Sequence, residues 1–126
     1  MVEVEIPNKV AGIGGSAFAQ TGIQYIVVPN NVIYIGGNAF NSSSLLSVTI
    51  GSGVVEIGGG TIIGNSSTKI ANIFVDENNQ NFKDVDGNLY SKDGSTIIRY
   101  AIGKTQEELS LPQDVLTIGY YAFRSC

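Results

Sequence analysis

A phrase of apolar residues recurs along this chain at a fixed offset, and no other feature constrains the fold as strongly. The first copy comprises Ile6, Pro7, Val10, Ile13, Gly14, Ala17 and Phe18, and it returns 22 positions later as Val28, Pro29, Val32, Ile35, Gly36, Ala39 and Phe40. A third copy, which departs from the phrase at some positions, begins at Ile50, and a nearly intact fourth copy begins at Leu111. Repeats of about 20 to 50 residues form solenoids, because a single repeat cannot bury its apolar face alone.

Each coil of this solenoid is expected to contain a strand that ends at the proline position. Ile26 and Val28 lie two residues apart, so on a strand both side chains point into the core while Tyr25 and Val27 point outward. Proline ends the strand because it cannot donate the next ladder hydrogen bond. A glycine follows the isoleucine of each copy and predicts a tight corner with positive φ, at Gly14, Gly36, Gly58 and Gly119.

The copies divide residues 1–126, which we expect to form a single domain, into successive coils. The expected coils are about 4–25, 26–47, 48–72, an expanded coil 73–108 and a partial coil 109–126. In the expanded coil, Asp93-Gly94 separates two apolar runs, which predicts a β-hairpin between residues 88–91 and 96–100. The predicted fold is a β-rich, right-handed solenoid with parallel strands, short helical or 3-10 turns and one inserted hairpin.

Composition excludes several kinds of partner. The formal net charge is −4 and no cluster of basic residues occurs, which argues against binding to nucleic acid or anionic membranes. No run approaches the about 18 to 20 apolar residues that a membrane span needs, so no membrane insertion is expected. The single cysteine, Cys126, cannot form an internal disulfide and leaves the redox compartment open.

The chain offers little catalytic chemistry. It contains no histidine, which removes Ser-His-Asp and Cys-His arrangements and the commonest metal ligand. We assign the acidic residues around the expanded coil to turns, namely Asp76, Glu77, Asp84, Asp86 and Asp93. Asp84 and Asp86 do not match a calcium loop in spacing, although an irregular Ca²⁺ site there stays open. No enzyme activity, cofactor or metal is therefore expected.

The outward positions of the strands are the candidate partner-binding surface. In stacked coils these side chains form a ladder on one face, and the candidates are Tyr25, Val27, Ser47, Thr49, Asn72 and Phe74. Exposed apolar groups on such a face mark partner sites. One alternative is that the inserted hairpin covers Phe74, and the roles of Ile33 and Tyr34 on the second face are equally open.

The repeated Ile-Pro-x-x-Val-x-x-Ile-Gly-x-x-Ala-Phe phrase, with Asp-Gly-Asn-Leu-Tyr-Ser-Lys-Asp-Gly at residues 86–94, resembles the BspA-like, Treponema-type leucine-rich repeats of bacterial surface proteins. The resemblance covers nearly the whole chain, with departures such as Gly51 for proline and Ile62 for phenylalanine. It implies an extracellular or cell-surface location. It also implies adhesion to a protein, such as a host matrix or plasma protein, or to a glycan.

The resulting hypothesis is a non-catalytic protein-binding or adhesion module. The alternatives are a purely structural spacer and a glycan-binding or carbohydrate-active solenoid. Because the chain begins and ends within a repeat phrase, we interpret it as a piece of a longer array. Its terminal coils carry open strand edges and apolar residues such as Ile6, Phe18, Leu111 and Phe123, so end-to-end self-association is expected.

Overall fold

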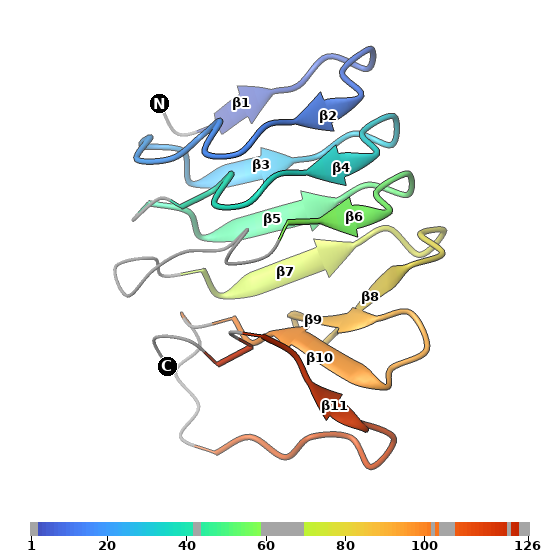
Figure 1. The fold of residues 1–126 in the computed structure, drawn as a ribbon. Coiled ribbons are helices and arrows are strands. Elements are labelled where there is room, and N and C mark those ends of the chain that lie inside the picture. Colours follow the sequence, from blue (N-terminus) through green and yellow to red (C-terminus); the bar gives the residue numbers. More distant parts are fainter. Residues whose placement is uncertain are drawn as a thin grey trace.

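The computed structural model in Figure 1 describes residues 3–41, 44–58, 70–101, 103, 108–120 and 122–123. These residues form eleven strands and no helix, wound as a right-handed solenoid with parallel strands. The short helical or 3-10 turns of the sequence prediction do not occur in the described part of the chain. Single turns take their place, as where the Ala17 N–H donates to the Gly14 carbonyl at 3.2 Å.

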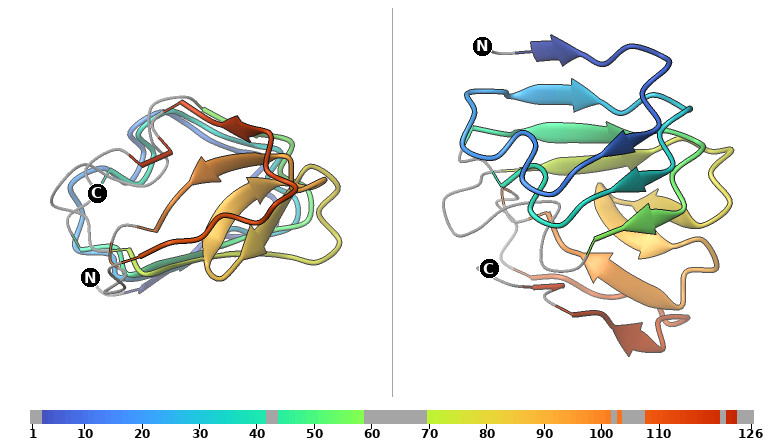
Figure 2. Two further views of the ribbon diagram at one scale, coloured as in Figure 1. Left: turned by 90° about the horizontal axis from the view of Figure 1, so that it is seen from below. Right: turned by 45° about the horizontal axis from the view of Figure 1, so that its top comes forward.

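Two parallel sheets form the walls of the solenoid. Sheet A runs in the order β1 (Glu3–Glu5), β3 (Tyr25–Val27), β5 (Ser47–Ile50) and β7 (Asn72–Val75). Sheet B runs in the order β2 (Gly12–Ile13), β4 (Tyr34–Ile35) and β6 (Glu56–Ile57). Seen along the solenoid axis, the coils that carry these strands superpose (Figure 2, left). Each strand therefore pairs with its counterpart in the next repeat, as the sequence predicts.

The repeated apolar residues fill the space between the two sheets. Val28, Val32 and Ile35 of the second coil are buried, as are Val48, Ile50 and Val54 of the third. The rings of Phe18 and Phe40 stack with centroids 5.8 Å apart, so the Ala-Phe pair places one ring above another in neighbouring coils. The core prediction from the repeat is therefore confirmed.

The corner glycines are required for a reason that differs from the prediction. None of the four has positive φ; that conformation falls instead on residues such as Ser16 and Asn38, with φ of 60° and 58°. A Cβ on Gly36 would lie 2.4 Å from the backbone nitrogen of Gly15 in the preceding coil. At Gly36, and likewise at Gly58, glycine is thus needed because the backbones of successive coils touch, and the prediction of positive φ is wrong.

The expanded coil contains more than the single predicted hairpin. Sheet C comprises β8 (Phe82–Val85), β9 (Asn88–Ser91), β10 (Thr96–Arg99) and β11 (Thr117–Ile118). The antiparallel pairing of β9 with β10 confirms the predicted hairpin, while β8 adds a second hairpin that the sequence analysis missed. Its two-residue turn is Asp86-Gly87, with φ of 53° and 78°, values typical of a type I′ turn.

The second hairpin covers the open edge of β7. The Ile73 N–H donates to the Gly87 carbonyl at 2.8 Å, and the Val75 N–H donates to Oδ2 of Asp84 at 2.7 Å. Strand β9 then separates two apolar clusters, because Leu89 belongs to the main core while Tyr90 belongs to a second cluster with Ile97 and Ala122. The insertion therefore ends sheet A without leaving its edge unpaired.

Asn79 explains how the regular coil changes direction into the insertion. It occupies the position of Val32 and Val54 in the repeat, and it is fully buried. Its Nδ2 donates to the carbonyls of Gly51 and Val54 at 2.9 and 3.0 Å. Its Oδ1 accepts the N–H groups of residues 81 and 82 at 2.8 and 2.9 Å. One amide side chain thus satisfies four backbone groups.

Asn79→Val restores the residue type of the repeat, yet we expect it to destabilise the fold. The valine leaves buried backbone groups without partners, which costs about 2 to 4 kcal/mol in the free energy of unfolding. Urea unfolding followed by circular dichroism measures this difference. Asn78→Val, at the exposed neighbouring position, is the control and should change stability by less than about 1 kcal/mol. An Asn79→Val variant as stable as the parent chain would contradict the role assigned to Asn79.

Asp93 organises the turn between β9 and β10. Its Oδ1 accepts hydrogen bonds from the Ser95 N–H at 2.9 Å, the Ser95 hydroxyl at 2.7 Å and the Ser91 hydroxyl at 2.8 Å. These hydrogen bonds lower the pKa of Asp93 to about 2, and the bond from the Ser95 N–H has the largest effect. Because folding lowers the pKa of Asp93, the ionised carboxylate stabilises the folded state at pH values above the ordinary pKa of an aspartate. This stabilisation is lost as the pH falls toward 2.

We expect the Asp93 carboxyl to remain largely ionised at about pH 3, below its ordinary pKa of about 3.9. The chemical shift of the side-chain carboxyl carbon (Cγ) of Asp93, followed by NMR as the pH is lowered, measures this ionisation directly. In a Ser95→Ala variant, which keeps the N–H donor but loses the hydroxyl, the pKa should rise. A midpoint near pH 4 in the parent chain would show that the carboxylate does not hold the turn.

Candidate functional site

The outer face of sheet A carries the side chains that the sequence analysis singled out. The strand register aligns them in two columns across the coils. The first column is Glu3, Tyr25, Ser47 and Asn72, and the second is Glu5, Val27, Thr49 and Phe74. All six candidate residues therefore lie on one face, in neighbouring rows. Their part in binding stays a prediction.

The exposed fraction differs among these side chains. Tyr25 is 47% exposed, Val27 60% and Phe74 45%, whereas Ser47, Thr49 and Asn72 are half-buried. The inserted hairpins pack against the edge of β7 and leave its outward face open, so they do not cover Phe74. The face thus presents the large exposed side chains of Tyr25, Val27 and Phe74 beside the smaller, half-buried polar side chains.

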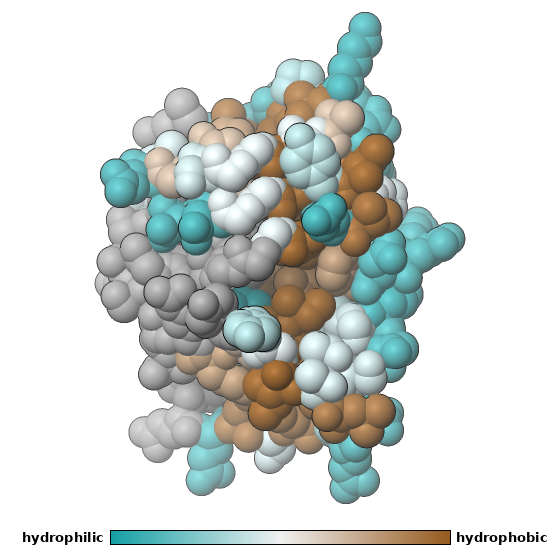
Figure 3. All heavy atoms as spheres, viewed as in Figure 1, coloured by the Kyte–Doolittle hydropathy of each residue, from teal (hydrophilic) through white to brown (hydrophobic). Residues whose placement is uncertain are grey.

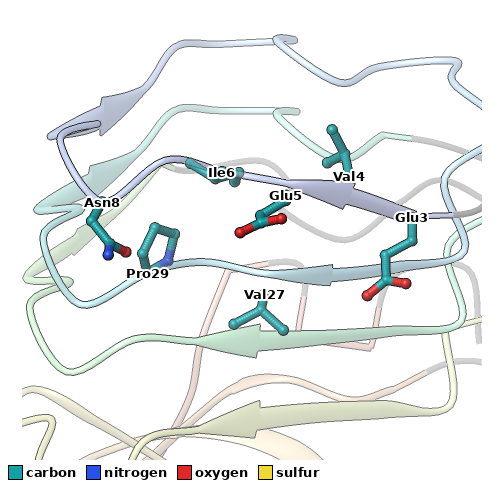
Figure 4. Close-up of a pocket in the computed structure, with 7 residues that line it drawn as sticks. All are labelled: Glu3, Val4, Glu5, Ile6, Asn8, Val27 and Pro29. Atoms are coloured by element: carbon teal, nitrogen blue, oxygen red, sulfur yellow. The ribbon is translucent and has the colours of Figure 1, made fainter.

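A groove of about 520 Å³ lies at the β1 end of this face. Its lining includes Glu3 and Glu5 of β1, Asn8, and the apolar surfaces of Val27 and Pro29. In Figure 4, Glu3 and Glu5 project from the same side of β1, while Val4 points the other way. The two columns contain no lysine or arginine, so this end of the face is acidic.

A second set of exposed apolar residues lies in and just before the strands of sheet B. Ile33, Tyr34 and Val55 are 51%, 48% and 53% exposed. Figure 3 shows hydrophobic side chains along this side of the stack with hydrophilic ones among them, and Glu56 of β6 is exposed beside Tyr34. Sequence reasoning considered Ile33 and Tyr34 but missed Val55, although its place directly after the inward Val54 matches that of Ile33 after Val32. Tyr34 lies against the preceding coil, because a Cβ on Gly12 would be 2.3 Å from its ring.

The acidic residues of the expanded coil serve its turns and strand edges. Asp84 accepts the Val75 N–H, Asp76 accepts the Asn78 N–H at 2.8 Å, and Asp93 holds the turn described above. Burial raises the pKa of Tyr90, and the negative charge of Asp86, which lies in the type I′ turn, raises it further. Within the described ranges, no three His, Cys, Asp or Glu residues are grouped so that they could hold a metal ion.

The described residues contain no helix of the length and apolar character that a membrane crossing requires.

Solved structures with this fold come from bacteria. They are a leucine-rich cell surface protein from Faecalibacterium prausnitzii (TM-score 0.82, 23% identity, covering 100% of this chain), a leucine-rich repeat protein from Eubacterium ventriosum (0.71, 24%, 99%) and the pneumococcal vaccine antigen PcpA (0.69, 22%, 91%). At these identities the likeness establishes the fold. The chain spans only 33%, 39% and 34% of their respective lengths.

A comparison with curated proteins finds no match. The family model for the BspA type leucine rich repeat region, by contrast, matches residues 1–92 in six copies. That match agrees with the parallel strand ladder, the touching corner glycines and the stacked phenylalanines of the structure. The chain belongs to the BspA-type leucine-rich repeat family.

Proposed function

We propose that this chain is a non-catalytic protein-binding module that binds its partner through the outer face of sheet A. The observation that carries the proposal is the exposure of Tyr25, Val27 and Phe74 in two aligned columns of outward side chains. Large apolar side chains gathered on the surface of a repeat protein are typical of partner sites.

The rigidity of the wall supports this role. Each strand of sheet A is bound to its neighbours, and the side chains between the exposed positions, such as Ile26 and Val48, are locked in the core. A surface that is already ordered loses less conformational entropy when it binds, so more of the contact energy appears as affinity.

We further propose a secreted or cell-surface location and a role in adhesion. The support is the family together with the name of the Faecalibacterium structure, which is a cell surface protein. A partner such as a host matrix or plasma protein would contact Tyr25, Val27 and Phe74 with its apolar groups. The acidic groove at Glu3 and Glu5 would favour a basic residue at that end of the contact.

Glycan binding is the second candidate, and one observation favours it. The 520 Å³ groove combines carboxylates with the amide of Asn8 and an apolar floor, which suits sugar hydroxyls and ring faces. This alternative predicts that Glu3→Gln and Glu5→Gln abolish binding to a glycan array. A purely structural spacer, the third alternative, would bind neither kind of probe.

The test compares matched substitutions on the two faces. We expect Val27→Ser with Phe74→Ser to weaken binding to immobilised matrix or plasma proteins by about thirtyfold, since loss of a central apolar anchor costs about 2 kcal/mol. Ile33→Ser with Val55→Ser makes the same kind of change beside sheet B and should leave affinity within about threefold. Biosensor measurements give both values, and unchanged thermal unfolding verifies the fold.

Loss of binding only in the sheet B pair would move the site to the other face and overturn the proposal. Failure of the parent chain to bind any matrix, plasma or glycan probe would favour the spacer.

A further inference from the structure

The outward columns of sheet A carry carboxylates on strand β1. Glu3 and Glu5 are exposed, and the strand register aligns them with Tyr25 and Val27. From β1 to β7 neither column contains a lysine or an arginine. Nothing within the columns therefore balances the negative charge of Glu3 and Glu5.

Carboxylates also border the opposite side of the face, beside Phe74. The β8–β9 hairpin, which lies next to β7 in Figure 1, binds the backbone N–H groups on both sides of Phe74. One of these groups donates to Oδ2 of Asp84 at 2.7 Å, and the other donates to the carbonyl of Gly87 at 2.8 Å. Phe74 thus lies alongside the half-buried Asp84 and close to the exposed Asp86, which precedes Gly87 in the chain.

The lysines Lys83 and Lys92 of this region interact with other groups. The Nζ of Lys83 lies at the turn between β9 and β10, because a Cβ on Gly94 would be 3.1 Å from it. The Nζ of Lys92 donates to the backbone carbonyl of Glu77 at 3.0 Å. The exposed apolar side chains of sheet A are therefore bordered by carboxylates on two sides, with no basic side chain between them in the columns.

We propose that the partner of sheet A is a polypeptide segment with an apolar centre and a basic residue on each side of that centre. This inference rests on the binding role proposed for sheet A and names the chemistry of the partner. The apolar centre contacts Val27 and Phe74, and lysine or arginine side chains reach the carboxylates on the two sides. Complementary charge of this kind selects among partners and speeds their encounter.

The strand spacing sets the distance between the two basic residues. Neighbouring strands lie about 4.8 Å apart, so the path from β1 across β7 to the hairpin is about 19 Å long. An extended peptide advances about 6.7 Å between side chains that point the same way. Four alternate positions span about 20 Å, and they match a basic, apolar, apolar, basic order.

Two synthetic peptides test this assignment against the whole chain. The first is Lys-Ser-Leu-Ser-Leu-Ser-Lys, and the second has glutamate in place of both lysines. We expect the lysine peptide to shift the NMR amide signals of Val27, Thr49 and Phe74, and the glutamate peptide to leave them unchanged. Raising the salt from about 50 to about 500 mM should weaken the lysine peptide about fivefold, because salt screens exposed charges.

Matched substitutions test the two sides of the face. Glu5→Gln with Asp86→Asn removes one carboxylate from each side and should weaken the lysine peptide about fivefold, as for two exposed ion pairs. Asn-Gly suits the type I′ turn as well as Asp-Gly does, so the hairpin is preserved. Glu56→Gln with Asp114→Asn, at exposed positions outside sheet A, makes the same change in net charge and should leave the affinity within about twofold.

Equal losses in the two double variants would assign binding to net charge and overturn the inference. Equal shifts by both peptides, or no shift by either, would also overturn it. If Val27→Ser with Phe74→Ser weakens binding but Glu5→Gln with Asp86→Asn does not, the basic partner is wrong while the binding face stands. If the serine substitutions have no effect either, the binding role of sheet A fails as well.

Discussion

Successive coils of this solenoid touch along their backbones, and the distance between them leaves no room for a side chain at the corner. Gly36 and Gly58 each lie where a Cβ would come within 2.4 Å of the preceding coil. That contact lets their N–H groups donate to Ile13 and Ile35 at 2.7 Å. The sheets, the stacked rings and the aligned outward columns all depend on this spacing, because it sets the rise from one coil to the next.

The insertion shows what replaces that contact when the repeat is interrupted. Asn79, at a valine position of the repeat, bonds to four backbone groups, and Asp84 with Gly87 pairs the edge of β7. Asn79 is thus buried where the direction of the chain changes, and both ends of its amide have hydrogen-bond partners. The regular wall ends there without an exposed strand edge, so the outer face of sheet A keeps a defined boundary next to Phe74.

The same backbone contact separates the parts of the molecule that fold from the parts that can bind. Inward residues such as Val48 are committed to the core, while Val27 and Phe74 remain available because the strand alternates. Sheet B is equally regular, yet its exposed apolar residues include Tyr34, whose ring already packs against Gly12. Exposed apolar residues are therefore present on two walls, and the groove lined by Glu3 and Glu5 at the β1 end is a feature of sheet A.

The sequence by itself determined the repeat, the parallel strands, the inward and outward positions and the hairpin from β9 to β10, because periodicity and turn chemistry are local properties. Tertiary structure alone decided the rest. The role of the corner glycines, the four bonds of Asn79 and the exposure of Phe74 and Val55 all depend on which backbone lies next to which, whereas the turn Asp86-Gly87 before β9 is a local signal that could have predicted β8. Contacts between coils join residues 21 or more positions apart, and no local pattern encodes how closely those backbones approach.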